Sequence, residues 1–455
     1  MRVTVIGAGY VGLTTGVALA YLGHEVTAID KKKSVIESLL AGKPPLHEPG
    51  LYELFAEVRR RMRFDVELTP ETAGADVVLI CVGTPPQKNG DADMHYVEEA
   101  ARAVAEQLPA GVNTLVVNKS TVPVGSARRV EAIVREGLAR RGVAAKVAVA
   151  SNPEFLREGS ALYDTLYPDR IVVGAEDGGA VERLRRLYQP ILEGSFPPPK
   201  GLARADGQGL PVFLTTTPTS AELCKYVANT FLAMKVSFAN EMAGIAERVG
   251  ADVTEVMRAV GLDRRIGGRY LGAGAGWGGS CFGKDVRALL ALGKEYGYEM
   301  PLAAGTLRVN ERQRRVVVDK LQAALKVIRG STIGLWGLTF KPNTDDLRDA
   351  PAVDVANMLA GMGARVRAYD PVGLDRAKRE YPELEAAGVE YATSAVAAVE
   401  GADAVVLMTE WDEFLHVDWQ AVAAAMRGRF VVDGRNALDR EALERLGFWY
   451  WGIGR

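Results

Sequence analysis

A glycine-rich segment, residues 276–285, surrounds Cys281 and continues into Lys284 and Asp285. A free cysteine is most often a small buried apolar residue, but this one has little bulk around it and a predicted helix just after it. The helix N-terminus and the neighbouring ammonium would both lower the pKa of the thiol. A thiolate can trap an aldehyde as a thiohemiacetal, which can lose a hydride to become a thioester. Beside a hydride acceptor, such a cysteine would oxidise an alcohol twice, to an acid.

A second set of residues, near the N-terminus, has the spacing of a dinucleotide site. Gly7, Gly9 and Gly12 follow a predicted strand and open a predicted helix. The first glycine permits a tight turn, the second lets a pyrophosphate approach the backbone, and the third lets helix and strand pack. Asp30 ends the next predicted strand, where a carboxylate binds a ribose 2′-hydroxyl and repels a 2′-phosphate. The pattern predicts NAD rather than NADP; a glycine-rich turn without a ligand is the alternative.

Two further predicted strands end in loops with small polar residues, at residues 81–85 and 119–125. In open parallel sheets, ligands bind beyond the carboxyl ends of the strands. Thr84, Ser120 and Thr121 are therefore expected to line the cofactor crevice, although each of them alone is more often a turn residue.

Two pairs of polar residues, each four residues apart, are further candidates for chemistry. Lys225 and Asn229 lie four residues apart in a predicted helix, so both could donate hydrogen bonds to a developing oxyanion. An exposed polar stripe is the alternative for this pair. Glu154 and Glu158 follow a predicted strand, where one carboxylate could act as a general base on water. Surface charge is the alternative for these two.

The elements that must position these residues can be predicted from periodicity. Residues 1–150 alternate short apolar runs with helical patterns, which predicts βαβ units and a parallel sheet. A proline- and glycine-rich break at residues 195–211 predicts a surface loop. Residues 219–249 repeat apolar side chains at helical spacing after a capping box at 219–222, which predicts a long helix. The expected strands of this half are 3–6, 25–29, 77–82, 114–118, 147–150 and 170–174.

The alternation of strands and helices returns beyond residue 331, where Gly337 leads into a loop and Asp370 ends the following strand. We therefore expect an α/β protein with two doubly wound Rossmann-like domains joined by a long central helix. The predicted domains are residues 1–210, which bind the dinucleotide, a central helical dimerisation domain at 211–325 that carries Cys281, and a second Rossmann-like domain at 326–455. The further strands are expected at 332–335, 365–369, 404–408 and 430–432.

The composition excludes several classes of protein. The chain has 455 residues, 48% of them hydrophobic and 25% charged, with a formal net charge of -2. Nucleic-acid binders usually have basic domains, so we expect no nucleic-acid partner. No apolar run approaches the roughly 20 residues that span a bilayer, so we expect no membrane segment. Three cysteines form no disulfide framework, which favours the cytoplasm, and four histidines without ligand spacing predict no metal site.

Taken together, these motifs resemble the UDP-glucose 6-dehydrogenase family of nucleotide-sugar dehydrogenases. They occur in the family's order along nearly the whole chain. The matching stretches are Gly7–Gly12, Cys81–Pro85, Lys119–Gly125, Asn152–Gly159, Ala221–Asn229, Gly278–Asp285, Phe340–Lys341 and Asp433–Arg435.

The resemblance implies that UDP-glucose, two NAD⁺ and water yield UDP-glucuronate and two NADH. It implies that Cys281 is the nucleophile, and that a further set positions the C6 oxygen and a water and stabilises charge. This set is Lys225, Asn229 and Asp285, while Glu154 assists thioester hydrolysis with Thr121 ordering the water.

The resemblance also implies the binding residues. For NAD these are Gly7, Gly9, Tyr10, Val11, Gly12, Asp30, Lys33, Val82, Gly83, Thr84, Ser120, Thr121, Glu158, Lys284 and Arg348. For the UDP-sugar they are Glu154, Phe155, Leu156, Glu158, Lys225, Asn229, Arg265, Tyr270, Leu271, Gly272, Gly274, Gly278, Phe340, Lys341 and Arg435.

The family's long helix forms the core of a homodimer, and Arg265 resembles the residue that reaches the neighbouring subunit's substrate. The chain departs from the family pattern at Val35, where a basic residue is common, so that Lys33 is expected to substitute. The alternatives are a dehydrogenase of GDP-mannose or of a UDP-N-acetyl-hexosamine such as UDP-N-acetylmannosamine, and a non-catalytic nucleotide-sensing protein.

Overall fold

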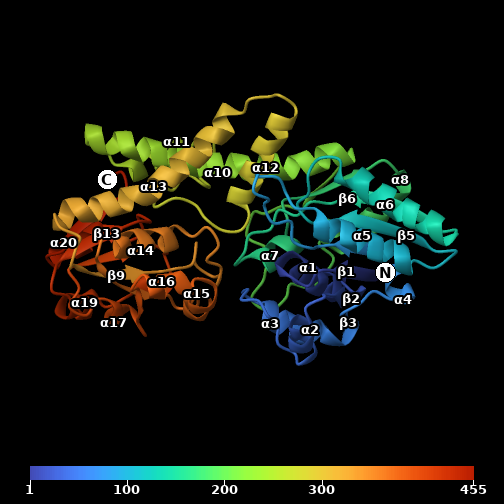
Figure 1. The fold of residues 1–455 in the computed structure, drawn as a ribbon, viewed down its shortest axis with the longest axis horizontal. Coiled ribbons are helices and arrows are strands. Elements are labelled where there is room, and N and C mark those ends of the chain that lie inside the picture. The colour runs from blue at the N-terminus through green and yellow to red at the C-terminus, as the bar shows by residue number, and fades with distance from the viewer. The chain divides into compact units, whose positions relative to one another are not determined.

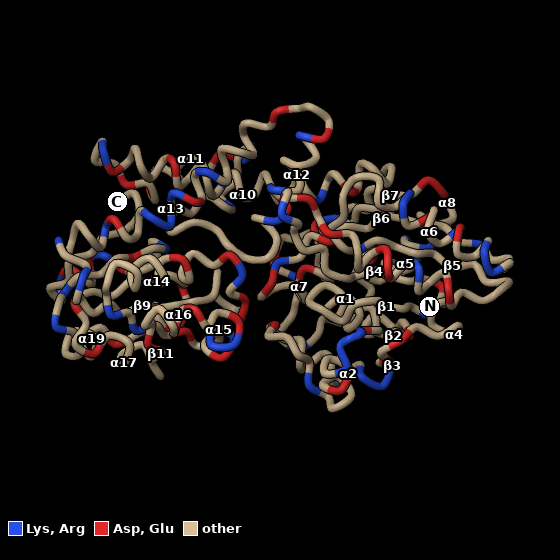
Figure 2. Tube along the Cα trace, in the orientation of Figure 1, with Lys and Arg blue, Asp and Glu red and all other residues tan.

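The computed structural model describes residues 1–455 and divides into two compact units, Met1–Val227 and Ala228–Arg455 (Figure 1). The boundary between them falls inside the long helix α10 (Pro218–Val249). Each unit contains its own sheet and its own apolar cores. Lys and Arg alternate with Asp and Glu along both units (Figure 2). None of the helices combines the length and the hydropathy that a bilayer-spanning segment needs.

The first unit is built on an eight-stranded sheet in the order β3-β2-β1-β4-β5-β6-β7-β8. Every neighbouring pair is parallel except β6 and β7. The strand order reverses between β1 and β4, which is where open sheets of this kind bind ligands. The strands are β1 (Arg2–Ile6), β2 (Glu25–Ile29), β3 (Met62–Asp65), β4 (Val77–Ile80), β5 (Asn113–Asn118), β6 (Lys146–Ser151), β7 (Arg170–Ala175) and β8 (Val212–Thr216).

Helices cover both faces of this sheet, because its strands are apolar on both sides. In β4, Val77 and Leu79 pack into a core with α1, α3 and α8, whereas Val78 and Ile80 pack against α5 and α6. The helices are α1 (Tyr10–Tyr21), α2 (Lys33–Leu40), α3 (Leu51–Val58), α4 (Pro70–Ala73), α5 (His95–Gln107), α6 (Ser126–Arg141), α7 (Ala161–Leu166), α8 (Gly178–Leu187) and α9 (Gln189–Glu193), with a 3₁₀ turn at Arg59–Arg61.

The second unit repeats this architecture with a six-stranded, fully parallel sheet in the order β11-β10-β9-β12-β13-β14. Its strands are β9 (Thr332–Trp336), β10 (Arg365–Tyr369), β11 (Glu390–Tyr391), β12 (Ala404–Leu407), β13 (Phe430–Asp433) and β14 (Trp449–Gly452). Its helices are α11 (Val253–Gly261), α12 (Phe282–Glu295), α13 (Pro301–Leu325), α14 (Pro351–Gly361), α15 (Leu374–Glu380), α16 (Pro382–Ala386), α17 (Ala395–Ala398), α18 (Asp412–Leu415), α19 (Trp419–Ala425) and α20 (Arg440–Arg445).

The predicted α/β class, with two doubly wound sheets and a long helix, is confirmed. Four strands, β3, β8, β11 and β14, were not predicted, and each of them lies at the edge of its sheet. The predicted capping box is wrong. The helix begins one residue earlier, at Pro218, and the hydroxyl of Thr217 accepts a hydrogen bond from the Ser220 N–H at 3.2 Å. Proline favours this first helical position because it has no N–H to satisfy.

Candidate functional site

The glycines of the first βα turn are each required for a different reason. Gly7 has a φ of 98°, and a Cβ there would lie 2.7 Å from the carbonyl oxygen of Cys81. A Cβ on Gly12 would clash with the carbonyl oxygen of Gly7, because helix and strand touch at this point. Gly9 is exposed at the N-terminus of α1, and a Cβ there would meet no protein atom within 4 Å. The space above Gly9 therefore fits a ligand that approaches the backbone.

This difference predicts how two substitutions separate folding from binding. We expect Gly9→Ala to keep the melting temperature of the parent protein, because its φ of −77° suits alanine and its Cβ is unobstructed. The same methyl group would meet the pyrophosphate, so the Kd for NAD should rise about tenfold or more. Calorimetric titration with NAD measures this, and Gly12→Ala is the contrast, since it should unfold the domain. Unchanged NAD affinity in Gly9→Ala would place the dinucleotide elsewhere.

Asp30, at the end of β2, lies beside this turn. Its carboxylate accepts the N–H of Ala8 and the N–H of Lys32, both at 2.9 Å. The side chain is only half-buried, so its remaining lone pairs can accept hydroxyl donors from a ribose. Lys33 is exposed at the start of α2, and Lys31 forms an ion pair with Glu99.

The loops after β4 and β5 are tied to each other. The hydroxyl of Thr84 donates to the carbonyl oxygen of Thr121 at 2.7 Å, and that of Ser120 donates to the carbonyl oxygen of Val82 at 2.7 Å. Both hydroxyls are buried, so they shape the loops, while Gly83 is exposed between them. These residues lie at the carboxyl ends of neighbouring parallel strands, as the sequence predicted.

A buried ion pair joins the loop after β6 to helix α10. The ammonium of Lys225 lies 2.9 Å from Oε1 of Glu154, and both side chains are almost fully buried. Burial raises the pKa of the Glu154 carboxyl, but the attraction of Lys225 and the N–H of Leu156 outweigh it, so the pKa lies below its ordinary value. The ring of Phe155 lies 5.5 Å from the same ammonium. An ionised carboxylate and a hydrogen-bond donor are thus held together in a dry environment.

Polar residues that sequence reasoning missed surround this pair. Lys119 donates to the side-chain oxygen of Asn152 at 3.3 Å, and Tyr188 donates to that oxygen at 2.6 Å. Both Lys119 and Asn152 are buried, so the network fixes the start of the segment that carries Glu154. Lys119 and Asn152 both lie in motifs found in the sequence, but no spacing pattern indicated that their side chains contact each other.

Glu222 also has a role that its sequence position did not reveal. Its carboxylate accepts the N–H groups of Gly125 and Ala127 at 2.7 and 2.8 Å, and the hydroxyl of Ser151 at 2.8 Å. Glu222 therefore caps α6 and ties α10 to β6, one turn before Lys225. Burial raises the pKa of this carboxyl above its ordinary value.

Glu48 is a further buried carboxyl that sequence reasoning missed. It accepts a hydrogen bond from the hydroxyl of Tyr10, the N–H of Gly159 at 2.7 Å and the N–H of Leu162 at 3.3 Å. Burial raises the pKa of the Glu48 carboxyl above its ordinary value. The pKa of the Tyr10 hydroxyl is raised as well, by its own burial and by the nearby Glu48 carboxylate. This contact links the first glycine turn to the segment that ends at Glu158, which is half-buried.

In the second unit, Cys281 occupies the N-cap position of α12. Its sulfur lies 3.4 Å from the hydroxyl of Ser280, and its carbonyl oxygen accepts the N–H of Asp285 at 2.9 Å. The helix therefore starts directly at the cysteine, earlier than the pattern suggested. The partial positive charge of a helix N-terminus favours a thiolate at this position.

Asp285 is fully buried and is shared between two donors. Asn229 donates to its Oδ2 at 2.6 Å, and the ammonium of Lys284 lies 2.5 Å from its Oδ1. Both predicted partners of the cysteine, Asn229 and Asp285, are thus held together by α10 and α12. The ammonium of Lys284 pairs with this carboxylate, so we expect the helix N-terminus to contribute more than Lys284 to stabilising the thiolate of Cys281.

The predicted substrate loop, residues 270–278, lies against the second sheet. A Cβ on Gly274 would lie 2.6 Å from the carbonyl oxygen of Gly434, and the backbone at Tyr270 has a φ of 64°. Arg435 uses three of its donors on the carbonyl oxygens of Gly276, Phe340 and Met408. Two donors of this guanidinium remain for a ligand.

The remaining predicted residues of the second unit differ in exposure. Arg348 is bidentate to Asp346, Lys341 lies near the Phe340 ring, and Leu271 is buried next to the exposed Gly272. The side chain of Arg265 is 89% exposed and is held in a loop by Asp263. An arginine so exposed, on a loop held in place, could reach a molecule outside its own chain.

The second sheet differs from the first at the position that corresponds to the ribose-binding acid. Asp370 ends β10 as Asp30 ends β2, but it is fully buried. Its carboxylate accepts the N–H groups of Leu338 and Gly373 and the indole N–H of Trp411. With its oxygens occupied in this manner, Asp370 is a structural cap and does not face a ribose.

Comparison with known proteins agrees with this arrangement. Models of the UDP-glucose/GDP-mannose dehydrogenase family match the chain in three parts, the NAD binding domain at residues 1–192, the central domain at 219–312 and the UDP binding domain at 334–440. The UDP-glucose 6-dehydrogenase of Pseudomonas aeruginosa is 44% identical, over 100% of this chain and 98% of that protein.

Two solved structures are similar over the whole chain. The UDP-glucose dehydrogenase from the hyperthermophilic archaeon Pyrobaculum islandicum has a TM-score of 0.85 and 40% identity, and covers 100% of this chain and 97% of that one. The UDP-D-ManNAc dehydrogenase from Pyrococcus horikoshii has a TM-score of 0.83 and 28% identity, with coverage of 100% and 99%.

Proposed function

Because this chain belongs to the UDP-glucose/GDP-mannose dehydrogenase family, we propose that it oxidises the C6 alcohol of UDP-glucose to the acid of UDP-glucuronate, with NAD as cofactor. One observation carries the proposal: Cys281 occupies the N-cap position of α12, one turn before Asp285 of the buried Asn229–Asp285 pair. A thiol at a helix N-terminus beside a buried carboxylate and amide is suited to hold a carbonyl group.

The cofactor fits the residues of the first unit. The open space above Gly9, the N-terminus of α1 and the half-buried carboxylate of Asp30 match the needs of a pyrophosphate and a ribose diol. Bound NAD supplies the hydride acceptor for both oxidations. Asp30 favours NAD over NADP, because a carboxylate repels a 2′-phosphate.

In the first oxidation, C6 loses a hydride while its hydroxyl loses a proton, which gives an aldehyde. The thiolate of Cys281 then adds to the aldehyde carbon, so that a C–S bond forms and the former carbonyl oxygen becomes an alkoxide or hydroxyl. Donors are needed at that oxygen, and Lys225 and Asn229 supply an ammonium and an amide. Loss of a second hydride and of the hydroxyl proton converts this thiohemiacetal to a thioester.

Hydrolysis completes the reaction. Water adds to the thioester carbon and passes one proton to the Glu154 carboxylate, the C–S bond breaks, and Cys281 leaves as a thiolate while the carboxylic acid forms. Glu154 is ionised at neutral pH, because its pKa lies below the ordinary value, so its carboxylate can accept a hydrogen bond from the attacking water. Thr121, at the neighbouring strand end, is proposed to order the same water.

Two alternatives remain open to test. A dehydrogenase of GDP-mannose or of a UDP-N-acetyl-hexosamine would share the fold, whereas a non-catalytic nucleotide-sensing protein would not need the buried pair of Glu154 and Lys225. Burying charges costs stability, which favours a catalytic role for the pair. NADH formation should be measured with UDP-glucose, GDP-mannose and UDP-N-acetylmannosamine. We expect kcat/KM to be highest for UDP-glucose; preference for another sugar would reject the substrate, and no NADH with any sugar would favour the sensor.

We also propose that the protein is a homodimer through α10. Phe231, Phe238, Ile245 and Val249 recur at spacings of seven and four residues, which places them on one side of the helix. Their exposed fractions are 54, 48, 50 and 69%. Single exposed apolar residues are ordinary, but a row along one helix face marks an interaction surface. A second copy of this helix offers a matching apolar row.

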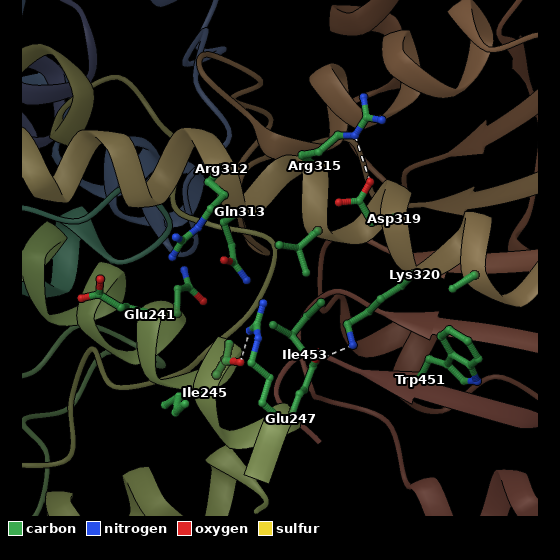
Figure 3. Close-up of a pocket in the computed structure, with 16 residues that line it drawn as sticks. Glu241, Ile245, Glu247, Arg312, Gln313, Arg315, Asp319, Lys320, Trp451 and Ile453 are labelled. Atoms are coloured by element: carbon green, nitrogen blue, oxygen red, sulfur yellow. Dashed lines mark hydrogen bonds and ion pairs between the residues drawn. The ribbon is translucent and has the colours of Figure 1, made fainter. Parts of the chain in front are cut away.

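A groove of about 770 Å³ lies beside this row, between α10 and α13 (Figure 3). Ile245 lines it, so the groove would lie at the edge of the dimer interface. Four of its charged side chains form two ion pairs, Lys320 with Glu247 and Arg315 with Asp319, and Glu241, Arg248 and Arg312 also line it. A partner helix would cover both ion pairs, so the charges buried in the interface would be of both signs.

Substitution of Phe238 tests the dimer. Phe238→Glu should weaken association about 30-fold or more, because a carboxylate would be buried in an apolar contact. Val327→Glu is the matched control, since Val327 is also exposed, at 63%, but follows the end of α13. Sedimentation velocity over a concentration series measures both. A parent protein that stays monomeric at micromolar concentration would contradict the assembly. The cytoplasmic location predicted from the small number of cysteines stays a prediction.

A further inference from the structure

The segment that carries Cys281 is held from behind by helix α13. Asn310, which is 3% exposed, accepts the N–H of Trp277 at 2.8 Å and donates to the carbonyl oxygen of Trp277 at 2.9 Å. A Cβ on Gly276, whose φ is 103°, would lie 2.7 Å from the side-chain oxygen of Asn310. The amide thus satisfies the backbone N–H and the backbone carbonyl of one residue, Trp277, at the start of the segment, with no room for a larger residue at Gly276.

One turn further along α13, Arg314 holds a second support of the same segment. Its guanidinium donates to the carbonyl oxygen of Asp349 at 3.0 Å and to the carboxylate of that residue at 2.6 Å. It also lies 2.7 Å from the carboxylate of Asp354. Asp349 has a φ of 52°, a conformation that only surrounding contacts maintain in a residue with a side chain. The two bonds from Arg314 are such contacts.

Asp349 in turn lies directly against the glycines around the cysteine. A Cβ on Gly278 would clash with the carbonyl oxygen of Asp349, and a Cβ on Gly283 would lie 2.7 Å from its carboxylate. The N–H of Gly279 donates to the carbonyl oxygen of Arg348 at 2.8 Å. The backbone on both sides of Cys281 therefore follows the position of the 348–349 peptide.

We propose that Asn310 and Arg314, four residues apart on one face of α13, are positioning residues that fix where the thiol of Cys281 lies. Asn310 acts directly on Trp277, and Arg314 acts through Asp349. This proposal rests on the proposed function, because it takes the thiol of Cys281 to be the nucleophile. A displacement of about 1 Å at a reacting group lowers turnover by about 100-fold, so loss of Arg314 should be visible in catalysis although it contacts no reacting atom.

The test compares Arg314→Met and Arg314→Lys with the parent, in the full-length protein. Arg308→Met is the control, because Arg308 is exposed on the opposite side of the same helix. Turnover and KM are measured with UDP-glucose and NAD. Alkylation of Cys281 by iodoacetamide is followed separately by peptide mass spectrometry, without substrate or cofactor, at a temperature well below the melting point of each variant.

We expect Arg314→Met to lower kcat about 10- to 100-fold with little change in KM for UDP-glucose, and to raise the alkylation rate of Cys281 at least about fivefold. Arg314→Lys should fall between, because an ammonium keeps the charge but cannot bridge Asp349 and Asp354 in the same geometry. If Arg314→Met does not fold, the lysine variant carries the test. An alkylation rate equal to that of the control, whether or not the melting point or kcat falls, would overturn the proposal. Since alkylation needs no sugar, this result is independent of which nucleotide sugar the enzyme uses.

Discussion

Cys281→Ser lowers the steady-state rate of NADH formation by about 1,000-fold or more, because a hydroxyl at a helix N-terminus is a far weaker nucleophile toward an aldehyde than a thiolate. The fold should remain, since serine is smaller and the N-cap position favours it. Any residual oxidation is expected to stop at the aldehyde level. The measurement is NADH absorbance with UDP-glucose, together with chromatography of the sugar product.

Cys224→Ser is the matched control for this substitution. Cys224 is partly buried, as Cys281 is, but it precedes Lys225 on α10 and has no place in the proposed chemistry. Its variant should turn over within about twofold of the parent. Near-normal formation of the acid by Cys281→Ser would remove the thiol from the mechanism.

Replacing Lys225 with methionine should be costly for both stability and catalysis. The ammonium is buried against Glu154 at 2.9 Å, and removing one member of a buried pair leaves the other charge uncompensated. Such a loss costs about 3–5 kcal/mol of the free energy of unfolding at neutral pH. Activity should fall further than stability explains, because the ammonium is also the proposed hydrogen-bond donor to the oxyanion. Urea unfolding and initial rates measure the two effects.

The loss of stability in Lys225→Met should change with pH in a definite direction. In the parent, the pKa of Glu154 is depressed below its ordinary value, chiefly by Lys225, so the stabilisation is fully present above the unfolded-state pKa and is lost as the pH falls through the folded-state pKa. In Lys225→Met, burial without its partner should raise the pKa, so protonation relieves the penalty. The difference in stability between the two proteins should therefore shrink on acidification toward pH 5.

A double variant separates the two roles of the pair. Lys225→Met combined with Glu154→Leu removes both charges, which is often neutral for stability when the replacements fill the space. We expect stability to return and activity to stay lost. A single variant whose stability deficit grows on acidification would contradict the assignment of an ionised Glu154.

Features that depend on the local spacing of residues could be predicted from the sequence. The turn at Gly7 and the strand ends at Thr84 and Ser120 follow from short patterns, and the structure places them at strand ends. A helix after Cys281 was also expected, but it begins earlier than the pattern indicated. The pairing of Lys225 with Glu154 was not predictable in the same manner, although both were singled out. Their contact depends on where α10 passes the end of β6, which no local pattern encodes.

The residues that were missed are joined to the site by long separations along the chain. Glu48 bonds to a backbone group 111 residues away, and Arg314 supports a segment 35 residues further on. A single glutamate or arginine of this kind has the same local sequence signal as a surface charge. Their roles became visible only through burial and through the hydrogen bonds that the fold imposes.

The thioester on Cys281 can be sought directly. Glu154→Gln should slow hydrolysis more than oxidation, so a quenched single turnover with UDP-glucose and NAD should contain a covalent adduct. Intact mass should show the protein plus UDP-glucose, less the two hydrides and two protons that oxidation removes, and peptide mapping should place it on Cys281. If two NADH form for each sugar while no adduct appears on Cys281 at any quench time, the sulfur does not carry the intermediate.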